Sequence, residues 1–155
     1  MTRMKRNPLR ALGLGVLGLL GACAGGEEAE GPREVARPTF TKDVVPLFQG
    51  SCGFGSGCHG TAQPAGYLPL VTSVADAATL RARLLEPSVR EPSLPRVKPG
   101  DAQGSFLLHK LTGDFTGLPC ASGACGERMP QRSTPLPDAD VALISRWIDQ
   151  GAVLE

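Results

Sequence analysis

Residues 40–60 read FTKDVVPLFQGSCGFGSGCHG, a short apolar pattern that runs directly into a glycine-rich loop carrying two cysteines and a histidine. Four large apolar residues recur at the helical spacing i, i+4, i+7 and i+8, and so share one face: Phe40, Val44, Leu47 and Phe48. Proline fits poorly inside a long helix but is tolerated in a short or kinked one, which suits Pro46. The pattern therefore predicts a short helix over residues 39–48, followed closely by the loop.

Five residues, three of them glycine, separate Cys52 from Cys58, and His59 directly follows the second thiol. This order resembles the haem attachment motif of c-type cytochromes, in which two thiols bond to the haem and the next histidine ligates the iron. That motif usually has two residues between the cysteines. Three interpretations stay open: a loop that carries haem through both thiols, a haem held by a single thioether with His59 still on the iron, and a Cys52–Cys58 disulfide in a fold without haem.

Three further helices are predicted C-terminal to this loop, over residues 73–85, 105–111 and 138–150. Ser73 and Asp76 are a plausible capping pair for the first of them, and Asp138 and Gly151 suit the two ends of the last. Loops rich in glycine and proline separate the helices, and no alternating pattern predicts a strand. The expected fold class is all-α, a small helical domain with long loops. Such a domain has a thin core and usually needs disulfides, a metal or a cofactor.

The N-terminal residues are typical of a targeting signal. A basic stretch precedes ten apolar or small residues at 11–20, too few to span a bilayer as a helix, and the sequence LGAC ends at Cys23. The pattern resembles a bacterial lipobox, which predicts a signal peptide at 1–22 and lipidation of Cys23. An ordinary signal peptide with a chance cysteine is the alternative. The acidic, small residues at 23–37 predict a flexible tether, and the domain occupies 38–155. We expect a lipoprotein anchored to the outer membrane, in the periplasm or at the cell surface.

The charge balance argues against a nucleic-acid partner. Without the four basic residues of the signal, 12 Lys and Arg remain against 15 Asp and Glu, and no basic run stands out. We therefore expect the membrane, through Cys23, and a redox protein that the sequence does not identify as partners.

Met129 is the only methionine outside the signal, and Pro130 follows it. A thioether is a common sixth ligand of haem iron, where it raises the reduction potential. His109 is the one other histidine, so a bis-histidine site is a second option. Nothing in the chain indicates proton-handling groups around an open iron site, so we expect no enzyme activity.

Four stretches together resemble a class I cytochrome c domain of secreted and lipid-anchored bacterial proteins, and they cover most of residues 38–155: FTKDVVPLFQGSCGFGSGCHG, VKPGDAQGSFLLHKL, CGERMP and ISRWIDQGA. The resemblance implies one covalent haem c and one-electron transfer. It implies that Cys52 and Cys58 attach the haem, and that His59 and Met129 ligate the iron. It also implies that the first and last helices cross, with Phe40, Val44 and Phe48 against Ile144, Trp147 and Ile148. Arg128 and Arg132, which flank the methionine, are candidate partners for haem propionates.

The remaining cysteines leave the disulfide pattern open. Cys120 and Cys125 precede Met129 by a few residues, and a bond between them would hold that loop, but four cysteines allow three pairings. A haem-free lipoprotein stapled by Cys52–Cys58 and Cys120–Cys125, acting as a binding or structural module, is the alternative function. A zinc site from Cys52, Cys58, His59 and Cys125 is conceivable by ligand type.

Overall fold

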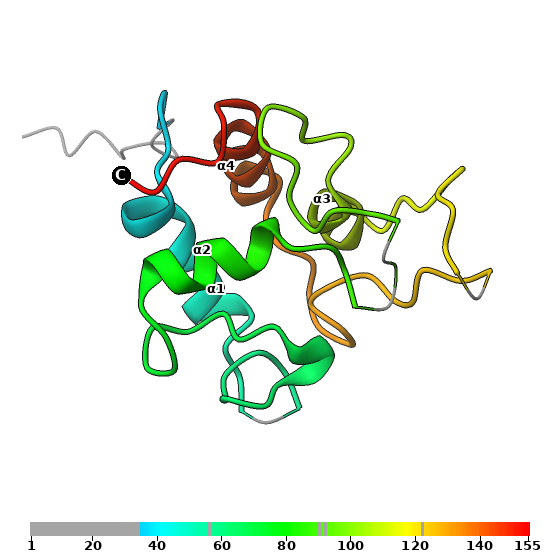
Figure 1. Ribbon diagram of the computed structural model, residues 1–155, viewed down its shortest axis with the longest axis horizontal. Helices are drawn as coiled ribbons and strands as arrows, with labels where there is room; N and C mark the ends of the chain where they lie inside the picture. The colour runs from blue at the N-terminus through cyan, green and yellow to red at the C-terminus, as the bar shows by residue number, and fades with distance from the viewer. Residues whose placement is uncertain (1–34, 56, 90, 92, 122) are drawn as a thin grey trace, which may run out of the picture. The chain divides into compact units, whose positions relative to one another are not determined.

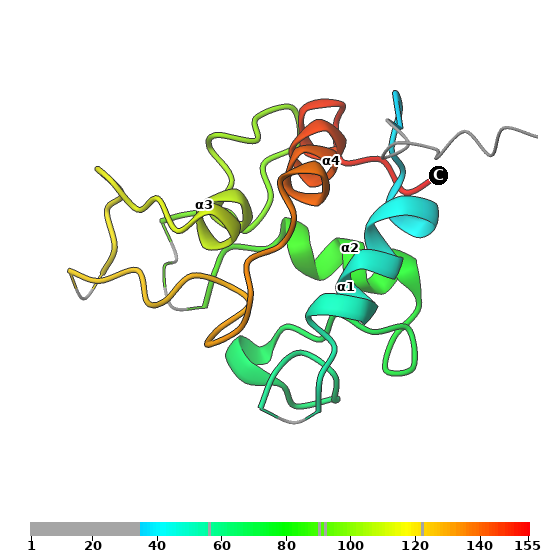
Figure 2. The ribbon, with the colours of Figure 1, turned by 180° about the vertical axis from the view of Figure 1, so that it is seen from behind.

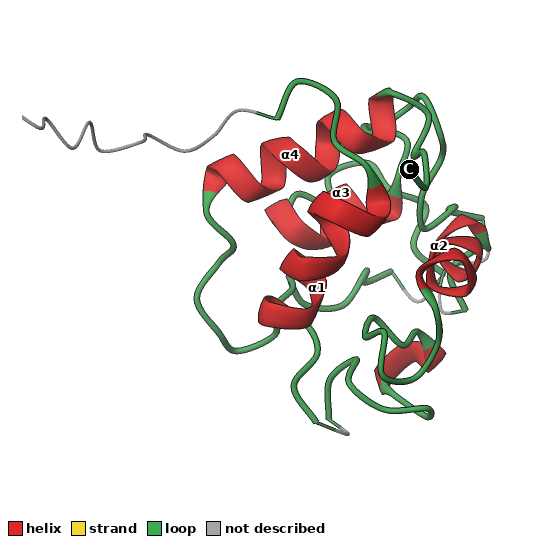
Figure 3. Ribbon diagram, turned by 90° about the vertical axis from the view of Figure 1, so that its left-hand side faces the viewer, coloured by secondary structure: helices red, strands yellow, loops and turns green. Residues whose placement is uncertain are grey.

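Helices joined by long loops make up the part of the chain that the structure describes. The computed structural model describes residues 35–55, 57–89, 91, 93–121 and 123–155, within one unit, Pro32–Glu155. Figure 3 shows helices and loops over these residues and no strand; the only β-type pairing among them is a bridge between Pro87 and Pro95. The all-α prediction is confirmed. The elements in chain order are η1 Phe40–Val44, α1 Val45–Ser51, η2 Ala65–Tyr67, α2 Ala77–Leu85, α3 Phe106–Thr112 and α4 Asp138–Asp149.

The predictions for the signal peptide, for lipidation of Cys23 and for most of the tether lie outside the described residues. None of the helices in the described ranges combines the length and the apolar character needed to cross a bilayer.

The first predicted helix forms as two successive segments. Residues 40–44 make a π-helical turn, η1, in which the Val45 N–H bonds to the Phe40 carbonyl, and α1 continues to Ser51. Pro46 lies in the first turn of α1, where a missing N–H leaves no helical bond unmade. The helix is confirmed and ends three residues later than predicted, at the edge of the cysteine loop.

The second predicted helix is shorter than expected at its start. Asp76 is its N-cap, because Asp76 Oδ1 accepts a hydrogen bond from the Thr79 N–H at 2.8 Å. Ser73 lies outside the helix, so the predicted capping pair is wrong and Asp76 alone caps α2. Leu80 and Leu84 face the core.

The two ends of the domain pack against each other. The six residues expected at the helix crossing are all buried in one apolar cluster: Phe40, Val44, Phe48, Ile144, Trp147 and Ile148. The rings of Phe40 and Trp147 lie 5.3 Å apart. Main-chain bonds from Phe40 N to Val153 O (3.0 Å) and from Thr41 N to Leu154 O (3.1 Å) join the last residues to the first segment, and Figure 1 shows them side by side.

The loops make the other half of the domain. α3 contacts α4, and the chain that follows α3, described over residues 113–121 and 123–135, projects away from the helices before it returns to α4 (Figure 2). The loop of residues 52–71 lies at the end of α1. Residues of both loops line one cavity, which is described below.

Candidate functional site

A cavity of about 540 Å³ lies between the cysteine loop, α3 and the loop that carries Met129. Its size falls in the range of sites that enclose a small molecule or cofactor. All four residues predicted to hold a haem line this one cavity: Cys52, Cys58, His59 and Met129. Its apolar walls come from Phe48, Leu68, Leu70, Leu84, Phe106, Leu107 and Leu111. The chain thus gathers two thiols, an imidazole and a thioether from positions up to 77 residues apart.

Two main-chain bonds fold the cysteine loop back on itself. Cys52 ends α1, and its carbonyl accepts a hydrogen bond from the His59 N–H at 3.0 Å. The Gly60 N–H donates to the Gly55 carbonyl oxygen at 3.3 Å. Glycine makes this closure feasible, because a Cβ on Gly60 would lie 2.2 Å from the Gly53 carbonyl oxygen. The five-residue spacer therefore still brings both thiols and the histidine to the cavity.

Both thiols of this loop are free. The Cys52–Cys58 disulfide of the haem-free alternative is not formed. Burial, and in second place the neighbouring Cys58, raise the pKa of the Cys52 thiol to about 11. Cys52 is therefore a protonated thiol at neutral pH.

His59 is held in the state that a metal ligand requires. Its Nδ1 lies 2.6 Å from the Leu68 carbonyl oxygen, so a neutral ring donates its proton there and keeps the Nε2 lone pair free. Burial lowers the pKa of His59, and the hydrogen bond to Leu68 opposes this only in part. A main-chain bond from Leu70 N to His59 O (2.9 Å) fixes the backbone as well. These contacts favour a neutral, oriented imidazole at pH 7.

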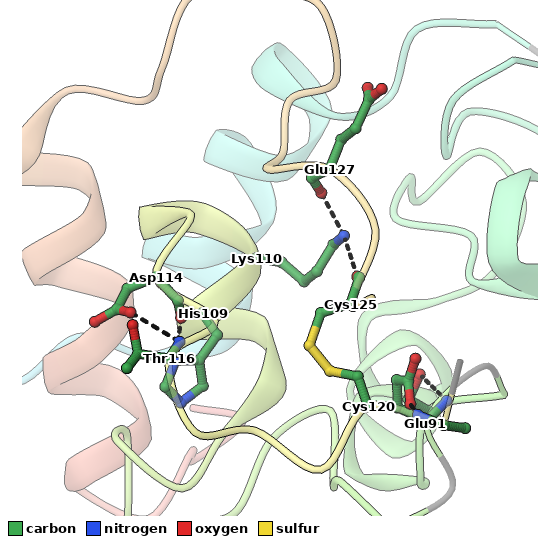
Figure 4. The surroundings of a disulfide bond; sticks show 10 residues. Glu91, His109, Lys110, Asp114, Thr116, Cys120, Cys125 and Glu127 are labelled. Atoms are coloured by element: carbon green, nitrogen blue, oxygen red, sulfur yellow. Dashed lines mark hydrogen bonds between the residues drawn. A yellow bond between two sulfur atoms is a disulfide. The ribbon is translucent and has the colours of Figure 1, made fainter. Parts of the chain in front are cut away.

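Met129 reaches the opposite side of the cavity on a loop anchored to α3. The Met129 N–H donates to the Lys110 carbonyl oxygen at 2.6 Å. Upstream, a disulfide joins Cys120 and Cys125, which settles for this structure the pairing that the sequence left open. The buried Glu91 carboxylate accepts a hydrogen bond from the Ala121 N–H, so the disulfide loop is also tied to residues 87–95 (Figure 4).

The zinc alternative does not assemble. Cys125 is bonded to Cys120, and no group of three or more His, Cys, Asp or Glu side chains among the described residues is placed to hold a metal ion.

Several residues weighed from the sequence lie away from the cavity. His109 is turned toward two main-chain oxygens, Asp114 O at 2.7 Å and Gln103 O at 2.8 Å, and does not line the cavity (Figure 4). Arg128 and Arg132 do not line it either. Arg128 packs its stem against Gly113 at the C-cap of α3. The bis-histidine option and the two predicted propionate partners therefore lack support.

Two cations that the sequence did not single out line the cavity instead, Arg96 and Lys110. Arg96 is 8% exposed, and burial lowers its pKa while Glu86 opposes the shift. Its Nη1 donates to the Arg83 carbonyl at 2.9 Å and lies 3.5 Å from the Glu86 carboxylate. Arg96 directly precedes the VKPGD sequence, but the neighbouring residues give no indication that its side chain points into the cavity.

Searches of protein-family models, of curated proteins and of solved structures find no match to this chain. What the site does is therefore argued from its own residues.

Proposed function

We propose that this chain is a lipid-anchored, periplasmic c-type cytochrome that transfers single electrons and has no catalytic activity of its own. In this proposal Cys52 and Cys58 attach one haem c, and His59 and Met129 are the axial ligands. The observation that carries the proposal is that these four side chains, distant in sequence, line one apolar cavity of about 540 Å³.

The donor set fits the group. When bound, haem would supply a one-electron iron couple whose potential follows its ligands and its burial. His59 presents Nε2 because Nδ1 is engaged with Leu68. The Met129 thioether is a soft ligand that favours the reduced iron. Apolar walls from α2, α3 and the cysteine loop would limit the access of water to a bound ring.

The cavity is also suited to the acidic edge of such a ring. Arg96 is a buried guanidinium with several donors in a fixed plane, and its protein contacts use Nη1. A carboxylate in the cavity would give this cation a second counter-charge besides Glu86, whose side chain is 64% exposed. Arg96, rather than Arg128 or Arg132, is the residue we propose for this role.

The haem-free alternative expects two disulfides, and one of them is not formed, since Cys52 and Cys58 are both free and both line the cavity. The five-residue spacer between these cysteines favours the haem-free alternative, but both thiols still line the cavity.

The test is expression of the full chain with cytochrome c maturation machinery, followed by an absorption spectrum and an intact mass after denaturation. We expect a c-type spectrum and a mass increase of one haem. The Cys52→Ser, Cys58→Ser double variant should lose the covalent haem, while the matched Cys120→Ser, Cys125→Ser double variant should keep it. A colourless wild-type chain would refute the proposal.

A further inference from the structure

Three hydrogen bonds of Lys110 attach the loop that carries Met129 to α3. The main-chain oxygen of Lys110 accepts the Met129 N–H at 2.6 Å. Its ammonium donates to the Cys125 carbonyl oxygen at 3.1 Å and to the Glu127 carbonyl oxygen. Figure 4 shows the ammonium between these two oxygens, close to the disulfide. Lys110 therefore holds the loop at three positions within five residues.

These bonds satisfy groups that would otherwise lack partners. The last carbonyls of a helix have no intrahelical donor, and Lys110 lies in the last turn of α3. The loop supplies the missing donor from Met129. In return, the charged ammonium binds loop carbonyls, and a hydrogen bond with a charged partner is stronger than a neutral one.

The loop backbone is shaped to reach the ammonium. Gly126 has a φ of +76°, which favours glycine, and a Cβ at this position would lie 3.3 Å from Lys110 Nζ. On the other side, the ammonium lies 5.8 Å and 5.2 Å from the ring centroids of Phe106 and Phe115. The rings and the carbonyls together fix one place for the charge.

We propose that Lys110 is the positioning residue for Met129: it holds the methionine loop against α3, so that the thioether stays at the cavity and resists displacement. This inference rests on the proposed function for its consequence at the iron. The attachment itself is a property of the chain, which makes the two separable by experiment.

The first experiment measures amide hydrogen exchange in the full chain made without maturation machinery. In Lys110→Met, which keeps a long apolar stem and removes the charge, exchange at residues 126–129 should be faster by on the order of tenfold, because both hydrogen bonds of the ammonium are lost. Lys98→Met is the matched control, because Lys98 makes an exposed ion pair with Asp101 and does not line the cavity. It should leave exchange at residues 126–129 unchanged.

The second experiment measures imidazole binding to the ferric holoprotein by absorption. Lys110→Met should bind imidazole on the order of tenfold more tightly, because the competing thioether is held less firmly. In a Met129→Ala background the same substitution should change the affinity little, since there is no methionine left to position. This non-additivity is the signature of a residue that acts through Met129.

Unchanged exchange in Lys110→Met would overturn the inference. So would an equal effect on imidazole affinity with and without Met129, which would mean that Lys110 acts on the site by another route. A chain that takes up no haem would refute the proposed function, while the exchange experiment would still decide whether Lys110 anchors the loop.

Discussion

The two ends of the helical domain and the two loops at the cavity are held by different forces. η1 and α4 meet through large side chains with no exposure, Phe40 and Trp147 among them. The loops are held by individual hydrogen bonds, from His59 to Leu68 and from Met129 to Lys110. Burial of apolar area carries most of the folding free energy, whereas one hydrogen bond contributes about 1 kcal/mol. The packing of η1 and α1 against α4 therefore supplies most of the folding free energy. The two loops add little to it and are held in place by contacts with the helices.

The largest expected effect tests this division directly. Trp147→Ala should lower the free energy of unfolding by about 3–5 kcal/mol, because it removes a fully buried ring from the helix crossing. Met129→Ala, at the cavity, should cost about 1 kcal/mol or less in the chain without haem. Urea unfolding followed by circular dichroism measures both. Similar losses for the two variants would contradict the division.

Cys52 lies where α1 ends and the cysteine loop begins, so its reactivity tests whether this position is buried like the helices or solvated like a loop. With its pKa raised to about 11 by burial and by Cys58, it should react with iodoacetamide at pH 8 about a hundredfold more slowly than in urea, where the ordinary value is 9.0. The rate should rise about tenfold per pH unit from 8 to 10. Alkylation of Cys52 in the wild-type chain, followed by peptide mass spectrometry, gives the rate. In a Cys58→Ser variant, which removes the second cause, burial alone should still slow the reaction, by less than in wild type. A folded-state rate equal to that in urea would place Cys52 in the solvated loop.

The smallest expected effect concerns α2, a helix fixed by one cap. Asp76→Ala should lower the melting temperature slightly, and Asp76→Asn, which keeps an acceptor, should lower it less. Hydrogen bonds, first from the Thr79 N–H, lower the pKa of Asp76. Its contribution is therefore present above the unfolded pKa of about 3.9 and is lost as the pH falls through the lower folded value. Thermal melts between pH 2 and pH 6 should show a smaller slope for Asp76→Asn than for wild type. An equal slope would show that Asp76 does not supply it.

The same difference explains what the sequence predicted. Helical spacing at Phe40, Val44 and Phe48 reports burial, and the helices and their crossing were predicted well. The start of α2 was placed too early because Ser73 and Asp76 are both good caps, and only the tertiary position decides between them.

The sequence singled out the cysteines, the histidine and the methionine that line the cavity. It did not single out the two basic residues that line it. A Cys-His pair and a lone methionine are conspicuous in any sequence. Arg96 and Lys110 resemble surface residues until long-range packing turns them toward the cavity. Arg128 and Arg132 were favoured because they flank Met129, yet proximity in sequence does not set side-chain direction in a loop.

The pairing of Phe40 and Thr41 with Val153 and Leu154 brings the two ends of the folded domain to one place. A short peptide linker would therefore join residue 155 to residue 38, and new ends could be cut in an exposed loop without disturbing the core. Fusion partners at either end would likewise emerge together. The domain of residues 38–155 could therefore be inserted as a unit into a surface loop of another protein.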